Sequence, residues 1–284
     1  MTKHKNNIMD YPKSMFDRYL RILGVGRLEP SWEALTELTS AHLMKIPFEN
    51  VSKIHRAKVR GIRNIPSLEE YLEGIRQFHF GGTCYVNNYY LNLLLNHLKY
   101  KVKLGAVDIL VDGAPPNGHM VNMVTVDGRE AIVDVGFGAP FWYPIPSDSP
   151  IDVTIQLGPE RYVLKPKDDA GRNRFELYRD GQLKHGYLLK PSPKQVNDFA
   201  EVIARSYGDD APFLNSLVLI RFYRDRSVIL RNHTLTEFYG SESRTFTLAT
   251  KEDIIITVER RFGIPAHIVK EVINSMGELK AFES

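Results

Sequence analysis

The pattern of apolar and polar positions predicts helices in the first third of the chain. Apolar residues recur at helical spacing in four segments: 15–23, 32–44, 68–78 and 84–98. Ser31 and Ser67 directly precede two of these segments, where a serine hydroxyl can accept a hydrogen bond from the start of a helix. The fourth segment begins at Cys84 and is strongly apolar, so we expect a buried helix there.

From residue 101 onward the pattern changes to short runs rich in β-branched residues, separated by turn residues. Asp127-Gly128 and Asp180-Gly181 are dipeptides typical of two-residue hairpin turns. The runs predict consecutive strands: 101–111, 119–126, 130–136, 151–157, 161–166, 174–180 and 186–191. Such a series is typical of an antiparallel barrel or sandwich.

The last part of the chain mixes both patterns. A connecting helix is predicted over 194–206. Three strands are predicted after it: 217–222, 227–232 and 244–249. Two helices are predicted to close the chain: 251–262 and 266–276. Helices and antiparallel strands in separate blocks indicate an α+β fold.

Composition and charge narrow the class of protein. The chain has 284 residues, of which 43% are hydrophobic and 25% charged, as expected for a soluble globular protein of two or three packed units. A net charge of +3 is too small to indicate a nucleic-acid-binding surface. No apolar run approaches the roughly 20 residues that cross a bilayer, and none near the N-terminus resembles a signal peptide. We therefore expect a cytoplasmic protein without nucleic-acid or membrane partners.

Cys84 is the only cysteine, which excludes an intrachain disulfide and a multi-cysteine zinc site, and no metal site is predicted. It follows Gly81-Gly82-Thr83 at the predicted start of the buried helix. A helix N-terminus lowers the pKa of a thiol, and two glycines let a substrate approach the sulfur closely. Cys84 is therefore a candidate nucleophile. The alternative, a small buried apolar residue, stays open.

A cysteine nucleophile needs an imidazole partner and a third group that orients the imidazole. The Asp127-Gly128 turn sets Val126 opposite Arg129 in a hairpin. In that register His119 and Asp134 are diagonal neighbours on one face of the sheet, within reach of each other. The rest of this face is apolar, so we expect the two polar side chains to hydrogen-bond.

Nine histidines compete for the role of partner. His97 lies at the far end of the predicted helix and cannot fold back onto Cys84. His79, on the loop before the two glycines, is not dismissed by its spacing. His119 has the better geometric support, and a histidine satisfied within the core remains the alternative interpretation.

Five motifs stand along the chain: IPFEN at 46–50, GGTCYVNN at 81–88, IVDVGFG at 132–138, PFLNSLV at 212–218 and LRNHTLT at 230–236. In this order and spacing they resemble the arylamine N-acetyltransferase family. The resemblance extends from about Tyr19 to about Thr236. It implies a helical bundle over 1–100 that supplies the cysteine and an antiparallel β-barrel over 101–192 that supplies the histidine and aspartate. A connecting helix and an α/β lid over 193–284 complete a core like that of cysteine proteases and transglutaminases.

By the same resemblance, Cys84 takes an acetyl group from acetyl-CoA as a thioester. An arylamine, hydrazine or N-hydroxyarylamine then accepts the acetyl group in a ping-pong reaction. His119 would pair with the Cys84 thiolate and move protons, while Asp134 would fix the imidazole tautomer. Phe48 and Phe137 match family positions that line the acceptor pocket. The implied partners are an aromatic acceptor and coenzyme A, with acetyl-CoA as cosubstrate and no metal.

Phe80 departs from the family's pattern, which usually has an arginine before the two glycines. That arginine is a structural ion-pair partner, so Glu49 is expected to lack its companion or to find another basic residue. We expect altered packing beside the site rather than lost activity. The basic stretch 55–63 is expected to be a solvated loop, and the residues that contact coenzyme A are not predicted.

Two other classes of function remain open on the sequence. The same triad geometry serves amide synthases and thiol hydrolases, which would use a different acyl donor. A member of the family without catalytic activity would act as a binding protein.

Overall fold

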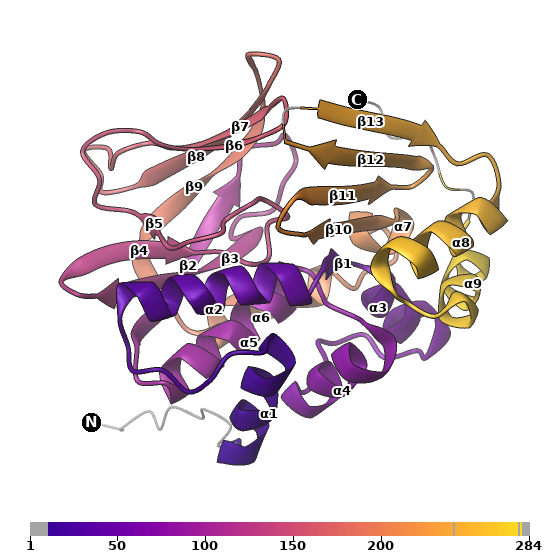
Figure 1. The fold of residues 1–284 in the computed structure, drawn as a ribbon, viewed down its shortest axis with the longest axis horizontal. Coiled ribbons are helices and arrows are strands. Elements are labelled where there is room, and N and C mark those ends of the chain that lie inside the picture. Colours follow the sequence, from indigo (N-terminus) through magenta and orange to yellow (C-terminus); the bar gives the residue numbers. More distant parts are fainter. Residues whose placement is uncertain (1–10, 241, 278, 280–284) are drawn as a thin grey trace.

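The computed structural model describes residues 11–240, 242–277 and 279 (Figure 1). Its α-helices are α1 (Lys13–Leu23), α2 (Trp32–Lys45), α3 (Val51–Ile54), α4 (Leu68–Phe78), α5 (Cys84–His97), α6 (Ala200–Arg205), α7 (Pro212–Asn215), α8 (Lys251–Phe262) and α9 (Ala266–Ser275). A π-helical turn, η1 (His55–Val59), follows α3, and a 3-10 helix, η2 (Val196–Phe199), precedes α6. None of the described helices is long and apolar enough to span a membrane.

The N-terminal helices begin where their capping residues predict. The Ser31 hydroxyl accepts a 3.1 Å hydrogen bond from the backbone N–H of Ala34 at the start of α2. At α4, Ser67 and Glu70 exchange side-chain to backbone hydrogen bonds, which satisfies two otherwise unpaired N–H groups. Helix α5 is buried over most of its length, as its apolar sequence predicts.

The larger sheet has eight strands in the order β5-β4-β3-β2-β9-β8-β7-β6, all antiparallel. Their bounds are β2 (Lys101–Ile109), β3 (His119–Val126), β4 (Arg129–Val133), β5 (Ile145–Pro146), β6 (Val153–Leu157), β7 (Glu160–Leu164), β8 (Asn173–Arg179) and β9 (Gln182–Lys194). The predicted register of the β3–β4 hairpin is confirmed, because Val126 pairs with Arg129 and Asn122 with Val133. The short β5 was not predicted.

The smaller sheet has five antiparallel strands in the order β1-β10-β11-β12-β13. Their bounds are β1 (Phe48–Glu49), β10 (Val218–Phe222), β11 (Arg226–Arg231), β12 (Thr234–Tyr239) and β13 (Glu242–Thr247). Strand β12 was missed in the sequence, where only three strands were predicted in this region. It follows a tight turn at Asn232, whose φ of 50° lets the chain reverse within two residues.

Asn50, at the end of the IPFEN motif, joins two distant segments of the chain. Its side-chain amide donates to the carbonyls of Phe213 and Ser216 and accepts from the backbone N–H of Val218. Strand β1 has only two residues, so these bonds and its pairing with β10 hold it in place. Two of the motifs that carry the family resemblance, IPFEN and PFLNSLV, are therefore hydrogen-bonded to each other in the folded chain.

Two further predictions need correction. Residues 55–63 are not a simple solvated loop, because 55–59 form the π-helical turn η1. Basic side chains from this stretch have acidic partners elsewhere: Arg56 pairs with Glu70 and Arg63 with Asp209. The single helix predicted over 194–206 is instead the 3-10 helix η2 followed by α6, because β9 continues to Lys194.

Successive side chains along the strands of the smaller sheet point to opposite faces, and both faces are buried. Ile220 and Ile229 pack into a hydrophobic core shared with the N-terminal helices and the larger sheet. Leu219 and Leu230, on the opposite face, pack into a second core with α8 and α9. In Figure 1 the N-terminal helices lie along one side of both sheets, and α8 and α9 flank the smaller one. This arrangement confirms the predicted α+β fold.

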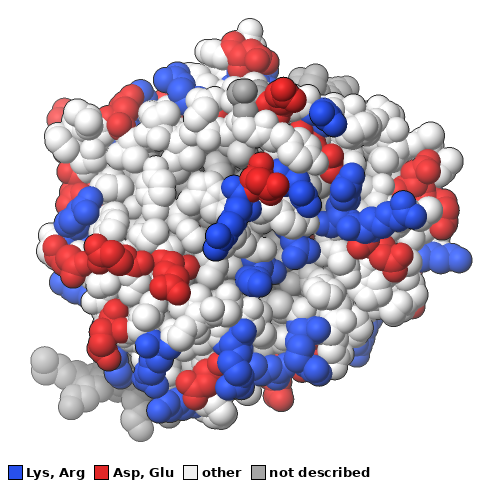
Figure 2. Space-filling view, in the orientation of Figure 1, with Lys and Arg blue, Asp and Glu red and all other residues white. Residues whose placement is uncertain are grey.

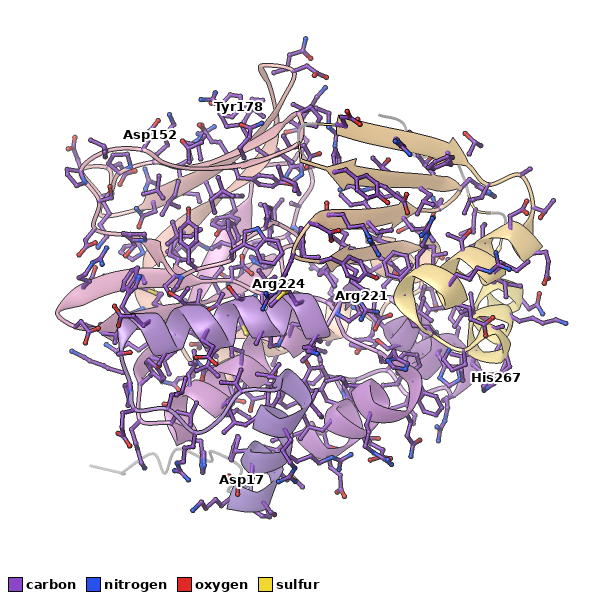
Figure 3. All side chains as sticks on the ribbon, viewed as in Figure 1. Asp17, Asp152, Tyr178, Arg221, Arg224 and His267 are labelled. Atoms are coloured by element: carbon purple, nitrogen blue, oxygen red, sulfur yellow. The ribbon has the colours of Figure 1, made fainter. Side chains whose placement is uncertain are left out.

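Charged side chains of both signs are spread over the face of the molecule in Figure 2. A group of basic side chains lies near its middle, where Figure 3 labels Arg221 and Arg224. Arg221, in β10, donates a 2.8 Å hydrogen bond to the carbonyl of Phe262, whereas Arg224 lies in the loop before β11. On this face the basic group is one patch among side chains of both signs, which agrees with a net charge of only +3.

Candidate active site

Cys84 is the first residue of α5, and the turn before it is shaped by two glycines. A Cβ atom at Gly81 would lie 1.9 Å from the carbonyl oxygen of Pro47, and one at Gly82 would lie 2.8 Å from the Cβ of Val86. No larger residue fits at Gly81 without moving the backbone. The turn places Cys84 at the N-terminal end of the helix with 7% of its surface exposed.

His119 and Asp134 hydrogen-bond to each other, as their diagonal positions in the hairpin predict. The Nε2 atom of His119 lies 2.7 Å from Oδ2 of Asp134, and both side chains are buried. His119 begins β3, and Asp134 follows directly after β4. A buried carboxylate at this distance orients the ring and leaves Nδ1 for a second partner.

Close packing brings Cys84 to this pair. Gly136 lies against α5, and a Cβ atom there would stand 2.6 Å from the Cα of Cys84. The Cys84 side chain also contributes to the raised pKa of His119, so the two side chains lie close together. The structure therefore brings Cys84, His119 and Asp134 together from a helix and from two ends of one hairpin.

The two predicted acceptor-lining phenylalanines lie beside this cluster. The centroid of the Phe137 ring is 5.1 Å from that of His119, in an edge-on arrangement. Phe48 packs edge-on against Phe213 at 5.8 Å, and its ring also borders Gly138. Flat aromatic walls beside a thiol suit an aromatic ligand.

The charge state of His119 depends on its two partners. Burial alone would lower its pKa, but the charge and hydrogen bond of Asp134 and the contact with Cys84 raise the pKa to about 10. The imidazolium is therefore the favoured form at neutral pH. A protonated ring between a carboxylate and a thiol is the arrangement that stabilises a thiolate.

Comparison with known proteins decides the family. A model of the N-acetyltransferase family matches residues 31–272. An arylamine N-acetyltransferase of Mycolicibacterium smegmatis is 32% identical over 261 residues, covering 87% of this chain and 90% of that protein. The chain belongs to the arylamine N-acetyltransferase family.

Other similarities extend over most of the chain. Proansamycin X synthase of Amycolatopsis mediterranei is 28% identical over 197 residues, covering 66% of this chain and 71% of that protein. The structure of the Mycobacterium marinum arylamine N-acetyltransferase in complex with CoA aligns with a TM-score of 0.77 at 21% identity, covering 92% of this chain and 100% of that one. The Salmonella typhimurium enzyme aligns with a TM-score of 0.77 at 19% identity, over 94% of this chain and 100% of that one. These two structures share the fold.

Asn88 also belongs to the site, although the sequence pattern did not assign it a role. Its side-chain amide donates to Oδ1 of Asp134 at 2.8 Å and to the carbonyl of Met120 at 2.6 Å, and it accepts from the N–H of Val135 at 2.9 Å. Asn88 therefore ties α5 to β3 and to the segment that follows β4. Its position four residues after Cys84, on the same side of the helix, is the signal that could have revealed it.

Replacing Asn88 with alanine is expected to lower kcat by about 10–100-fold, because Asp134 loses one of its charge-assisted hydrogen bonds. KM for the acceptor is expected to stay within about threefold, since Asn88 does not reach the acceptor side. Steady-state kinetics of the purified variant measures both constants. Asn92→Ala, one turn further along α5, is the matched control because Asn92 bonds to Asn122 instead of Asp134. An equal loss of kcat in both variants would point to general destabilisation of the helix.

His119 is also expected to make stability depend on pH. Its pKa is higher in the folded protein, about 10, than the ordinary 6.5, so the folded state binds the proton more tightly. The resulting stabilisation is complete below about pH 6.5 and is lost as the pH rises toward about 10. Urea unfolding of the wild type and of His119→Gln tests this. The difference in free energy of unfolding should shrink between about pH 6 and about pH 10, and a constant difference would contradict the assigned pKa.

Three of the other histidines have packing or hydrogen-bond partners elsewhere in the fold. His79 ends α4 with a φ of 54°, and its ring packs against Gly263. His97 stacks on Phe16 with ring centroids 4.4 Å apart, and His42 bonds to the hydroxyl of Tyr19. His4, also a histidine of the chain, lies outside the described residues. These three rings have partners other than Cys84. No group of three or more His, Cys, Asp or Glu side chains in the described ranges could hold a metal.

Because Phe80 precedes the two glycines, Glu49 was expected to lack a basic partner or to find another one. Within residues 11–240, 242–277 and 279, Glu49 forms no ion pair. It is buried and accepts hydrogen bonds from the N–H of Gly81 and from the N–H and hydroxyl of Ser52. Burial raises its pKa, and these hydrogen bonds oppose the rise. Backbone and hydroxyl donors therefore satisfy the carboxylate of Glu49.

Proposed function

We propose that this protein transfers an acetyl group from acetyl-CoA to the nitrogen of arylamines or hydrazines, or to the oxygen of N-hydroxyarylamines. The proposal rests on one observation above all: Cys84, at the start of α5, lies close to a His119 ring that is hydrogen-bonded to the buried Asp134. Membership of the family and the complex of its Mycobacterium marinum member with CoA support the choice of donor.

In the first half-reaction, the Cys84 thiolate attacks the carbonyl carbon of the acetyl thioester. The bond between that carbon and the sulfur of coenzyme A breaks, and the proton held by His119 passes to the departing CoA thiolate. Backbone N–H groups at the start of α5 are suitable donors to the oxyanion formed on the way. Cys84 is left as an acetyl thioester.

In the second half-reaction, the acceptor nitrogen attacks the carbonyl carbon of acetyl-Cys84. The carbon–sulfur bond breaks, and His119 takes the proton that the nitrogen loses, so the thiolate–imidazolium pair is restored. Phe48 and Phe137 would hold the acceptor ring between aromatic surfaces. Asp134 keeps the ring of His119 in one tautomer through both steps. Donor and acceptor use one sulfur in turn, which makes the reaction ping-pong.

An amide synthase that uses a longer acyl donor is the second candidate, and the similarity to Proansamycin X synthase favours including it. A thiol hydrolase would use the same triad on a peptide or ester. Incubation with acetyl-CoA and 4-methoxyaniline separates these activities. We expect release of coenzyme A that depends on the arylamine, formation of the acetanilide, and no cleavage of peptides. Absence of coenzyme A release from a folded protein would contradict the choice of donor and would favour the synthase or a binding protein.

A further inference from the structure

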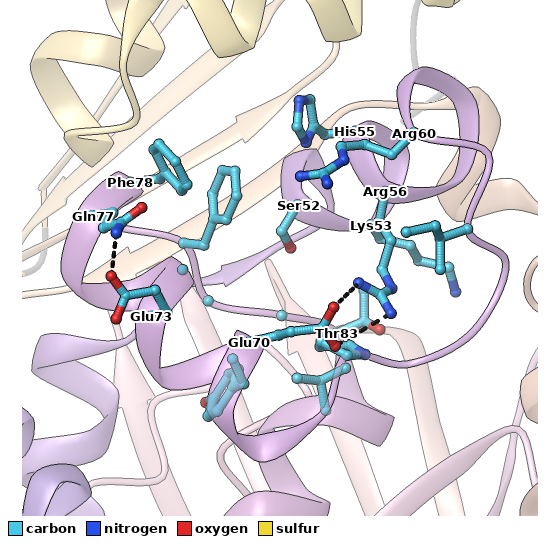
Figure 4. Close-up of a pocket in the computed structure, with 18 of the residues that line it drawn as sticks. Ser52, Lys53, His55, Arg56, Arg60, Glu70, Glu73, Gln77, Phe78 and Thr83 are labelled. Atoms are coloured by element: carbon cyan, nitrogen blue, oxygen red, sulfur yellow. Dashed lines mark hydrogen bonds and ion pairs between the residues drawn. The ribbon is translucent and has the colours of Figure 1, made fainter.

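A cavity of about 330 Å³ lies against the turn 80–83, which precedes Cys84. Its lining comes from the segment 52–62, from α4 and from the turn 80–83, together with Val86 and Tyr207 (Figure 4). Cys84, His119, Phe48 and Phe137 are not among the lining residues. The cavity is therefore separate from the site assigned to acetyl transfer, and its volume is at the lower end of the range for small-molecule sites.

The carboxylates and one of the cations that line the cavity already have partners. Glu70 pairs with Arg56 at 3.0 Å, and Glu73 pairs with two arginines outside the cavity. His55 bonds to Glu271 at 3.2 Å. No acidic group that lines the cavity is left to bind a cation.

Two other lining cations, Lys53 and Arg60, have no ion pair within the described part of the chain. Lys53 is only 6% exposed, and its ammonium donates to the Ser206 hydroxyl at 2.8 Å and lies 4.3 Å from the centre of the Tyr207 ring. Burial lowers the pKa of Lys53 to about 8, and the charge of Cys84 opposes this. A buried ammonium with one neutral hydrogen bond leaves donors for an anion.

The rest of the lining is largely apolar and aromatic. Phe78 and Phe80 lie with ring centroids 5.3 Å apart, and Tyr71, Val86 and Ile62 continue the wall. Figure 4 shows Phe78 on one side of the cavity and Lys53 and Arg60 on the other. Phe80, the residue that departs from the family's motif, is thus part of an aromatic surface that faces a cationic one.

We propose that this cavity binds a small aromatic monocarboxylate. The ring packs against Phe78 and Phe80, and the carboxylate accepts charge-assisted hydrogen bonds on the side of Lys53 and Arg60. A cation finds no unpaired carboxylate among the lining residues, and a neutral ligand would form no charge-assisted pair with Lys53 or Arg60. The site does not depend on acetyl transfer, so it can be tested by binding alone.

Isothermal titration of the full chain with 2-naphthoate, and with the neutral 2-naphthamide, tests the proposal. A ligand of this size that fills the cavity should bind with a Kd of about 1 mM or lower. The amide should bind at least about fivefold more weakly, because it lacks the charge. Absence of naphthoate binding at about 10 mM, or equal affinity for the amide, would overturn the proposal.

Variants then locate the bound ligand. Lys53→Met, which removes the charge and keeps most of the length of the side chain, is expected to weaken naphthoate binding about tenfold, and the more exposed Arg60→Gln about threefold. Lys58→Gln is the matched control, because Lys58 lies on η1, between Lys53 and Arg60 in the sequence, but bonds to Asn215 outside the cavity. Phe137→Ala should leave binding unchanged. Loss of binding in Phe137→Ala, with normal binding in Arg60→Gln, would place the ligand in the acceptor site and contradict the inference.

Discussion

Replacing Cys84 with serine should lower the rate of arylamine acetylation by at least about 1,000-fold. The hydroxyl of serine is far less acidic than a thiol, so the His119 imidazolium no longer has an anionic nucleophile beside it. The oxygen is smaller than sulfur and fits the same buried position, so the fold should persist. Initial rates of acetanilide formation measure the effect, and thermal unfolding checks the fold.

A serine variant with a rate within about tenfold of the wild type would remove Cys84 from the chemistry. Cys84→Ala is the second variant to measure, because the side chain of alanine contains no nucleophilic atom. The two variants are expected to be equally inactive. A serine variant that acetylates slowly while the alanine variant does not would indicate that the hydroxyl takes over the same covalent role.

Asp134→Asn should lower kcat by about 1,000- to 10,000-fold while leaving the shape of the site intact. The carboxylate accepts a hydrogen bond from Nε2–H of the imidazole, and an amide in its place favours the wrong tautomer. The charge that raises the pKa of His119 is also lost, so the remaining activity should fall off at a lower pH than in the wild type. The pH profile of kcat, measured beside the rate at neutral pH, separates this from general damage.

Asp148→Asn is the matched control for this substitution. Asp148 is an exposed aspartate that accepts a long hydrogen bond from the N–H of Glu130, at 3.3 Å. Its variant should keep kcat within about twofold. Comparable losses in both variants, or a nearly normal rate in Asp134→Asn, would contradict the assigned role of Asp134.

The His119–Asp134 contact could be predicted because it depends on one local feature. The Asp127-Gly128 turn fixes the hairpin register, and the register then fixes which side chains share a face. Asn88 could not be placed in the same way. Its bonds to Asp134 and Val135 exist only because the end of the hairpin packs against α5, which no local pattern reports.

The smaller sheet shows the same limit of sequence reasoning. Strand β1 has two residues, too few for any periodic pattern, and it pairs with β10 about 170 positions later in the chain. Strand β12 follows so closely on β11 that the turn at Asn232 hides the boundary between them. The cavity beside the turn 80–83 combines several separate segments and therefore appears only in the folded chain.

The covalent step is tested most directly by the intact mass of the protein after mixing with acetyl-CoA in the absence of an acceptor. The account predicts a gain of one acetyl group that is absent in Cys84→Ala and is discharged when an arylamine is added. That result would identify the donor, the nucleophile and the order of the reaction together. An unmodified mass in the folded wild type, or an acetyl group that persists in Cys84→Ala, would contradict the proposed mechanism.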